Sequence, residues 1–176
     1  MKFFETDLDD AYIIELDKLE DNRGFFVRTW DKKKIDERGL NSDLVQMSFS
    51  FSKHKGTLRG MHFQEEPFEE VKIVRCLKGK IFDVIIDLRK ESRTYKKWID
   101  FELSSNNLKM LYVPKGFAHG FQTLEDDTEV FYQMSNWFSP EHAQGIRWDD
   151  KQFDIKWPIE NPIISKKDLS YEKKAF

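Results

Sequence analysis

The sequence predicts an all-β fold of the antiparallel sandwich or barrel type. Short runs rich in β-branched and aromatic residues recur at close intervals along the chain. Turn-forming clusters separate these runs, among them Lys78-Gly79 and Pro114-Lys115-Gly116. Aromatic residues make up 15% of the 176 residues, which suits a β-rich core with aromatic-lined cavities.

The first half of the chain is expected to begin with a hairpin and one helix. Strands are predicted over residues 11–16 and 24–30, joined through a turn cluster at residues 20–24. Asp31 is placed to cap a short helix over residues 32–37, which Gly39 would end. Strict alternation over residues 45–52 predicts a strand with a polar face of glutamine and serines and a core face of Val45, Met47, Phe49 and Phe51.

Further strands are predicted over residues 57–64, 71–77, 81–88, 110–113, 121–124 and 129–135. The last forty residues have few regular periods, and their tryptophans lie among prolines. We expect them to form loops and short helices that pack over the sandwich. Because no internal repeat, low-complexity tract or linker is visible, a single domain is expected over residues 1–176.

Charge, cysteine content and hydropathy narrow the function classes. Charged residues make up 35% of the chain, yet the net charge is only −3, so no nucleic-acid partner is expected. The one cysteine, Cys76, lies in an apolar run, which excludes an internal disulfide and indicates a reducing compartment. No apolar run approaches a membrane span, and the N-terminus lacks the apolar core of a signal peptide. We therefore expect a cytoplasmic protein without a membrane partner.

The strand predicted over residues 57–64 carries more functional groups than packing requires. His62 shares one face with Leu58 and Gly60, whereas Arg59 lies on the other face. Both side chains enter one pocket only if the strand bulges, and Gly60 is the residue that would permit a bulge. His62 is then a candidate catalytic base. The alternatives are that His62 is a core histidine bonded to the backbone and that Arg59 is a surface arginine.

Three residues on other elements are candidates for the same pocket. Lys72 either emerges at a sheet edge or enters a cavity, where its ammonium group can stabilise an oxyanion. Tyr132 shares a mostly apolar face, so its hydroxyl needs a partner from the protein or from a ligand. Asp168 ends a capping-box pattern that begins at Ser165, so it either satisfies helix N–H groups or reaches His62 and holds the imidazole in one tautomer.

His119 ends a Pro-x-Gly-x-x-His pattern that begins at Pro114 and resembles the second metal-binding motif of the cupin superfamily. The first cupin motif needs His-x-His, but the corresponding stretch here contains only His62. Two histidines without a third ligand rarely hold a catalytic metal. A metal-dependent cupin is therefore kept only as an alternative.

Six segments, in order over nearly the whole chain, resemble the dTDP-4-dehydrorhamnose 3,5-epimerase family of nucleotide-sugar epimerases. They are residues 22–26, 56–64, 79–89, 114–121, 145–150 and 164–168. The resemblance implies a cupin-type antiparallel β-sandwich, or jelly roll, with a few short peripheral helices. It also implies a homodimer formed through the sheets, partly by exchange of N-terminal strands, and an enzyme with neither metal nor cofactor.

The same resemblance implies residue roles. His62 becomes the base with Asp168 as its partner, Tyr132 the acid on the opposite face of the sugar, and Lys72 the group beside the C4 oxygen. The nucleotide sugar would be held by Arg23, Gln46, Arg59, His119, Phe138 and Lys167, with Phe138 stacked on the base. The chemistry is coherent because hydrogens beside the C4 ketone of a 4-keto-6-deoxyhexose are acidified, and their removal gives an enolate.

The implied activity is epimerisation of a nucleotide-linked 4-keto-6-deoxyhexose, foremost dTDP-4-dehydro-6-deoxyglucose at C3 and C5, in rhamnose-type deoxysugar and polysaccharide biosynthesis. Four positions depart from the family: Arg28 and Ala143 replace acidic residues, Ser48 replaces an asparagine, and Phe138 replaces a tyrosine. The nucleotide, the sugar and the number of inverted centres therefore stay open. The alternatives are a single-centre C3 or C5 epimerase of another nucleotide sugar, such as a CDP sugar, and a non-catalytic sugar-nucleotide-binding cupin.

Overall fold

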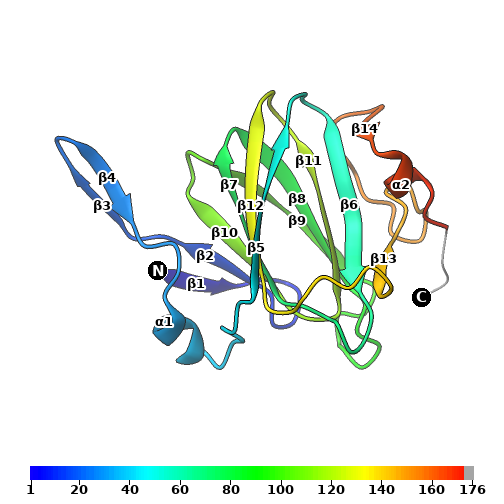
Figure 1. The fold of residues 1–176 in the computed structure, drawn as a ribbon, viewed down its shortest axis with the longest axis horizontal. Coiled ribbons are helices and arrows are strands. Elements are labelled where there is room, and N and C mark those ends of the chain that lie inside the picture. The colour runs from blue at the N-terminus through cyan, green and yellow to red at the C-terminus, as the bar shows by residue number, and fades with distance from the viewer. Residues whose placement is uncertain (173–176) are drawn as a thin grey trace.

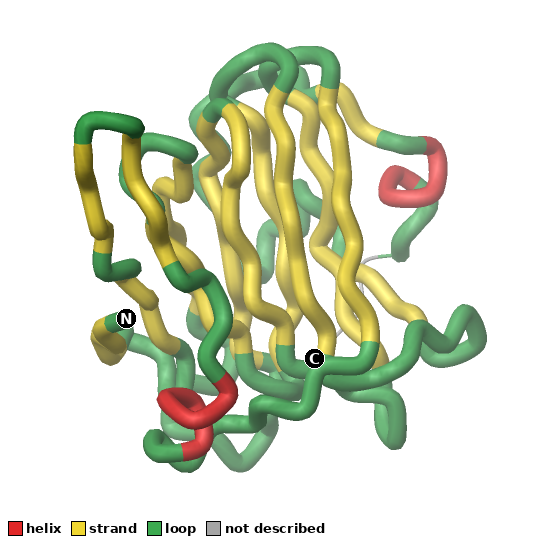
Figure 2. The backbone as a smooth tube through the Cα atoms, turned by 60° about the vertical axis from the view of Figure 1, so that its left-hand side comes forward, coloured by secondary structure: helices red, strands yellow, loops and turns green. Residues whose placement is uncertain are grey.

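The computed structural model describes residues 1–172 and consists mainly of two β-sheets packed face to face (Figure 1, Figure 2). In spatial order, the first sheet contains β1 (Lys2–Glu5), β2 (Tyr12–Glu15), β10 (Lys109–Val113), β7 (Lys72–Lys78), β12 (Thr128–Met134) and β5 (Gln46–Ser52). The second contains β13 (Ala143–Gly145), β6 (Thr57–Gln64), β11 (Phe117–Thr123), β8 (Lys80–Asp87) and β9 (Trp98–Ser104).

The pairings confirm the predicted antiparallel sandwich. Neighbouring strands in both sheets run antiparallel, and the short strand β14 (Ile163–Ile164) adds a parallel pair on β6. Buried aliphatic side chains from both sheets meet between them, for example Val74 and Leu111 from the first and Ile85 and Leu103 from the second. Cys76 is buried in the same core, and this burial raises the pKa of its thiol to about 11.

Strand β5 was predicted correctly as a strand but with its faces reversed. Met47, Phe49 and Phe51 are 58%, 54% and 47% exposed, whereas Ser52 is buried. The physical reason is that β5 is an edge strand whose inner face borders a cavity instead of the apolar core. Alternation shows that a strand has two different faces, but it does not show which face points inward.

Strands β3 (Lys18–Asp21) and β4 (Gly24–Val27) form a separate hairpin that projects from the sandwich (Figure 1). The expected pairing of residues 24–30 with residues 11–16 is wrong, because β2 is already paired on both sides by β1 and β10. The true partner, β3, contains the acidic residues that we assigned to a turn. Leu19, Phe25 and Phe26 on this hairpin are 67%, 53% and 60% exposed.

Two short helices lie at the periphery, as predicted. In α1 (Lys32–Asp36), the side chain of Asp31 accepts the N–H of Lys34 and caps the first turn. Helix α2 (Lys166–Leu169) lies beside β6, outside the sandwich (Figure 1). Over residues 1–172, no helix is both long and apolar enough to cross a membrane.

Candidate active site

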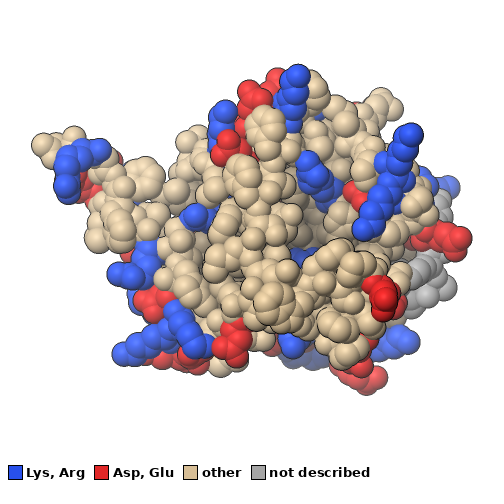
Figure 3. All heavy atoms as spheres, viewed as in Figure 1, with Lys and Arg blue, Asp and Glu red and all other residues tan. Residues whose placement is uncertain are grey.

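A cavity of about 790 Å³ opens between the two sheets on the side of β5 and β6. Its wall contains nine of the ten predicted site residues: Gln46, Arg59, His62, Lys72, His119, Tyr132, Phe138, Lys167 and Asp168. These residues come from five strands, the loop after β12 and helix α2. Around the cavity, basic and acidic side chains are interspersed on the face that Figure 3 shows.

The bulge predicted at Gly60 is confirmed by the register of β6 against β11. His62 lies opposite His119 but Arg59 lies opposite Phe121, so β6 has one residue more than β11 over this interval. Gly60 has a φ of +128°, and a Cβ atom there would lie 2.5 Å from the Cα atom of Gly120. The bulge turns both Arg59 and His62 toward the cavity.

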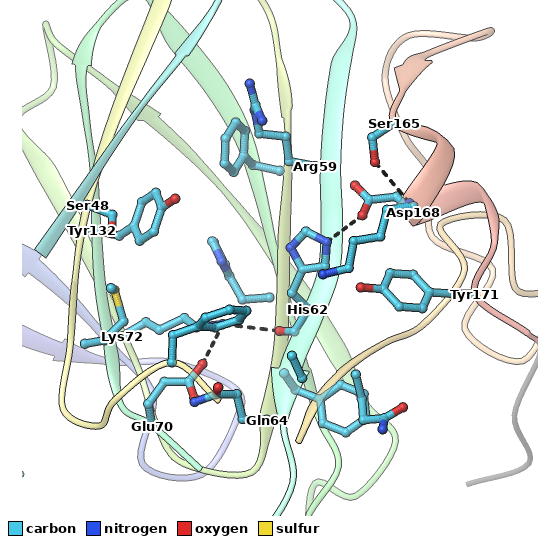
Figure 4. A pocket seen from close by; sticks show the side chains of 18 of the residues that line it. Ser48, Arg59, His62, Gln64, Glu70, Lys72, Tyr132, Ser165, Asp168 and Tyr171 are labelled. Atoms are coloured by element: carbon cyan, nitrogen blue, oxygen red, sulfur yellow. Dashed lines mark hydrogen bonds and ion pairs between the residues drawn. The ribbon is translucent and has the colours of Figure 1, made fainter. Parts of the chain in front are cut away.

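His62 and Asp168 form a hydrogen-bonded pair, with 2.8 Å between Nε2 and Oδ1 (Figure 4). Burial alone would raise the pKa of Asp168, but the hydrogen bond and charge of His62 outweigh burial and hold this pKa below its ordinary value. Asp168 therefore accepts Nε2–H as a carboxylate. The other ring nitrogen of His62, Nδ1, is left to act as a base at the cavity.

The capping pattern around Asp168 is also present. The hydroxyl of Ser165 accepts the N–H of Asp168 at 3.0 Å, so the serine caps α2. The second carboxylate oxygen of Asp168 accepts the N–H of Gly60 at 3.4 Å. Helix α2 thus aims the aspartate at β6: the serine of the capping pattern caps the helix, and the Asp168 carboxylate bonds to Gly60 and His62 of β6.

Lys72 enters the cavity and does not emerge at a sheet edge. Its side chain is 13% exposed, and Nζ lies 3.1 Å from Oε1 of Glu70. Nζ also donates to the carbonyl oxygen of His62 at 3.3 Å. The ammonium group therefore stands beside the His62 backbone, where it can stabilise a developing oxyanion.

Tyr132 lies across the cavity from His62, and its hydroxyl points into the open space (Figure 4). Its ring packs against the central core, and Ser48 lies directly opposite on β5. Within residues 1–172, no hydrogen-bond partner of this hydroxyl is found. A ligand in the cavity can therefore supply the partner that a phenol on an apolar face requires.

His119 belongs to a second imidazole–carboxylate pair. It lies within β11, because this strand begins at Phe117, four residues earlier than predicted. Its Nε2 lies 3.0 and 2.9 Å from the two oxygens of Asp83, whose pKa is raised by burial despite the opposing charges of His119 and Lys72. Among residues 1–172, no three His, Cys, Asp or Glu side chains are grouped to hold a metal ion.

The remaining predicted residues divide between the cavity rim and the hairpin. Oε1 of Gln46 accepts the N–H of Phe138 at 2.6 Å, and the Phe138 ring is 59% exposed. Arg59 is tied to β5 by a hydrogen bond of 3.0 Å from Nη2 to the carbonyl oxygen of Phe51. Arg23 is not in this cavity: it lies on the β3–β4 hairpin, 85% exposed, in an ion pair with Asp21.

Sequence reasoning missed three residues of the site. Asp83 had a visible signal, an acidic residue within the apolar run of β8. Glu70 lies in a charge-rich loop, and Tyr171 lies in the irregular C-terminal segment, so neither is distinctive in sequence. The ring of Tyr171 packs over Gly145, where a Cβ atom would lie 2.2 Å from it, and its centroid is 6.0 Å from that of His62.

A jelly-roll cavity that places an imidazole–carboxylate pair opposite a tyrosine, with a lysine beside the histidine backbone, defines a protein equipped for acid–base chemistry. Residues 5–175 match the family model described as dTDP-4-dehydrorhamnose 3,5-epimerase, and the chain belongs to this family. The family predicted from the sequence motifs is thereby confirmed.

Individual relatives match this chain over nearly its full length. The chain is 41% identical to a dTDP-4-dehydrorhamnose 3,5-epimerase of Shigella flexneri, over 98% of this chain and 96% of the relative. The crystal structure of such an epimerase from Bacillus anthracis, with TDP and PPi bound, is 42% identical with a TM-score of 0.96, covering 98% and 99% of the two chains. A dTDP-6-deoxy-D-glucose-3,5-epimerase of Legionella pneumophila, in complex with dTDP-4-keto-L-rhamnose, is 36% identical with a TM-score of 0.92, covering 98% and 92%.

Proposed function

We propose that the chain epimerises a nucleotide-linked 4-keto-6-deoxyhexose, with dTDP-4-dehydro-6-deoxyglucose as substrate and C3 and C5 as the inverted centres. The observation that carries this proposal is the placement of the His62–Asp168 pair and of Tyr132 on opposite sides of one cavity. The bound dTDP-4-keto-L-rhamnose of the Legionella pneumophila relative supports the substrate class. The product would enter rhamnose-type deoxysugar biosynthesis.

The mechanism follows from the directions of the side chains. Nδ1 of His62 takes a proton from a carbon beside the C4 ketone, and the Asp168 carboxylate stabilises the imidazolium that forms. The electron pair moves into the ketone and gives an enolate, whose oxyanion Lys72 stabilises. Tyr132 then returns a proton from the opposite face, and the centre is inverted. Each acid–base step of this kind is worth about 10²–10⁴-fold in rate.

The other cavity residues would bind the nucleotide sugar. Phe138 is exposed at the rim, where its ring can stack on a base, and Gln46 fixes its backbone. Arg59, His119 and Lys167 present cationic or hydrogen-bonding groups suited to a diphosphate and a sugar. Since the C4 ketone itself acidifies the neighbouring hydrogens, this route needs neither a metal nor a cofactor.

We further propose that the chain works as a homodimer. Support comes from the exposed apolar face of β5 and from the projecting hairpin, whose Arg23 has no contact with the cavity of its own chain. In a dimer, the hairpin would carry Arg23 to the partner's cavity. Sedimentation of the unaltered protein should give twice the chain mass. Phe49→Asp, which places a charge on the exposed face of β5, should shift the measured mass toward that of a monomer. A monomer for the unaltered protein would refute this proposal.

We also propose that the chain is a single domain and that it works in a reducing compartment. We treat residues 1–176 as one domain, because the family match spans residues 5–175 without interruption. The buried thiol of Cys76 fits the reducing cytoplasm that we infer for the enzyme.

Exchange with D₂O tests the function directly. The purified protein is incubated with each nucleotide-linked 4-keto sugar, and deuterium enters only at carbons that lose a proton. Exchange at C3 and C5 of the dTDP sugar is the expected result. Binding without exchange at any carbon would leave only a non-catalytic sugar-nucleotide binder.

A single-centre epimerase of another nucleotide sugar is the second candidate. It is favoured by Ser48 and Ala143, which depart from the family pattern and both line the cavity. Deuterium at only C3 or only C5, or faster exchange with a CDP sugar than with the dTDP sugar, would support this candidate instead.

A further inference from the structure

Glu70 is a buried acidic residue in the cavity wall that the mechanism above does not use. Its side chain is only 7% exposed. A carboxylate in such a place is costly unless it is paired, and both of its oxygens are engaged. Oε1 lies 3.1 Å from Nζ of Lys72, and Oε2 accepts Nε2–H of Gln64 at 2.5 Å (Figure 4).

The ammonium group of Lys72 has three N–H bonds, and the structure accounts for two of them. One faces Glu70, and another donates to the carbonyl oxygen of His62. These two acceptors come from the loop after β6 and from β6 itself, so they fix Nζ from two directions. The third N–H bond is left for a group bound in the cavity, which Lys72 lines.

The loop that presents Glu70 is held on both sides. The N–H of Val71 donates to the hydroxyl of Ser135 at 2.8 Å, and the N–H of Ser135 donates back to the carbonyl oxygen of Val71 at 3.0 Å. Nδ2 of Asn136 donates to the carbonyl oxygen of Glu69 at 3.3 Å. The backbone on either side of Glu70 is therefore fixed to the end of β12.

Gln64, the second partner of Glu70, is equally constrained. Its Nε2 also donates to the carbonyl oxygen of Phe68 at 2.8 Å. Its Oε1 accepts the N–H of Ser139 at 2.6 Å. Because Ser139 follows Phe138, the network runs from the ammonium group of Lys72 to the rim where the nucleotide base is proposed to stack.

We propose that Glu70 is a positioning residue of the epimerase, which holds the Lys72 ammonium group where the C4 oxygen of the bound 4-keto sugar must lie. This inference rests on the proposed function. An oxyanion is stabilised best by a donor that is already in place, and a lysine on a four-carbon stem has many alternative rotamers. Glu70 acts through Lys72 and does not touch the reacting atoms.

A double-mutant cycle of Glu70→Gln and Lys72→Met tests this role through kcat and KM. Glutamine keeps the shape of Glu70 but removes its charge. Glu70→Gln should lower kcat about tenfold and change KM less than about threefold. Added to Lys72→Met, it should cause no further loss, because the group that it positions is already gone. Glu69→Gln, on the same loop but outside the cavity, is the matched control and should keep the unaltered kcat.

Three outcomes would overturn the positioning role. They are an unchanged or raised kcat in folded Glu70→Gln, losses that multiply in the double variant, and an equal loss in the Glu69→Gln control. The melting temperature of each variant separates misfolding from a functional defect. If Glu70→Gln does not fold, Glu70→Asp keeps the charge but withdraws it by one methylene, and full kcat in that variant would count against the role. Absence of turnover by the unaltered protein would instead refute the proposed function.

Discussion

The His62 side of the cavity and the β3–β4 hairpin hold their charged groups in opposite ways. Asp168 is 6% exposed and fixed by His62, Gly60 and Ser165, all from its own chain. Arg23 is 85% exposed, and its carboxylate partner Asp21 is two residues away on the same hairpin. An exposed ion pair of this kind contributes little to stability.

We propose that this difference separates the groups that perform chemistry from those that contact a second chain. The groups proposed for acid–base chemistry are held in place by the fold itself, as catalysis by preorganised groups requires. The hairpin carries apolar side chains and an arginine into solvent, an arrangement that gains energy only on contact with another molecule. Substitutions on the His62 side should therefore lower turnover, whereas substitutions on the hairpin should raise KM.

The largest effect is expected from His62→Ala. Removal of the imidazole takes away the base, so both deuterium exchange and turnover should fall by at least about 10³-fold. NMR of the sugar in D₂O measures the exchange. His54→Ala, which alters an exposed turn residue outside the cavity, is the control and should exchange normally.

A smaller and more selective effect is expected from Tyr132→Phe. The ring stays in the core, but the hydroxyl that returns the proton is lost. Deuterium should still enter at a carbon beside the C4 ketone, while the inverted product forms about 10²-fold more slowly. If exchange and inversion fall together, or if His62→Ala retains the same turnover as Tyr132→Phe, our assignment of base and acid is wrong.

The hairpin should give a still smaller effect, confined to binding. Arg23→Ala should raise KM about tenfold with little change in kcat. Because the side chain is 85% exposed, the melting temperature should stay close to that of the unaltered protein. Lys18→Ala, on the same hairpin, provides the matched control. An unchanged KM in Arg23→Ala would remove the hairpin from the site.

The last expected effect concerns stability and its dependence on pH. The folded state holds the pKa of Asp168 below its ordinary value of 3.8, so the ionised carboxylate is favoured by folding. Its stabilisation is complete above that ordinary value and is lost as pH falls through the folded value. Asp168→Asn should therefore cost about 1–3 kcal/mol at neutral pH, and the cost should shrink in strong acid. Melting temperatures against pH measure this, with the exposed Asp7→Asn as the control; a cost independent of pH would contradict it.

Much of the His62 side could be predicted because its signals are local. Gly60 is two residues from His62, and a glycine inside a strand is a recognisable sign of a bulge. Ser165 and Asp168 are separated by the spacing of a capping box, so the helix that carries the aspartate was visible as well. The contact between Asp168 and His62 spans 106 positions and was predicted only through the family resemblance.

The other features could not be predicted from the sequence, because they depend on where each element lies in the folded protein. The two faces of β5 were evident, but its position at a sheet edge beside a cavity decided that Phe49 faces out and Ser48 faces in. Strand β3 has polar residues typical of a turn, and only the occupied edges of β2 exclude the alternative pairing. Glu70 resembles the other acidic residues of its loop until its contact with Lys72 is seen.

The position of α2 has a consequence for the order in which a newly made chain becomes active. The strands of both sheets up to β13 are complete at Gly145, whereas Asp168 is synthesised 23 residues later. Translation therefore delivers the strands that enclose the cavity first and the carboxylate that orients the imidazole last. Because Asp168 follows all of these strands in the sequence, the hydrogen bond that fixes the His62 tautomer is completed only once α2 has packed against β6.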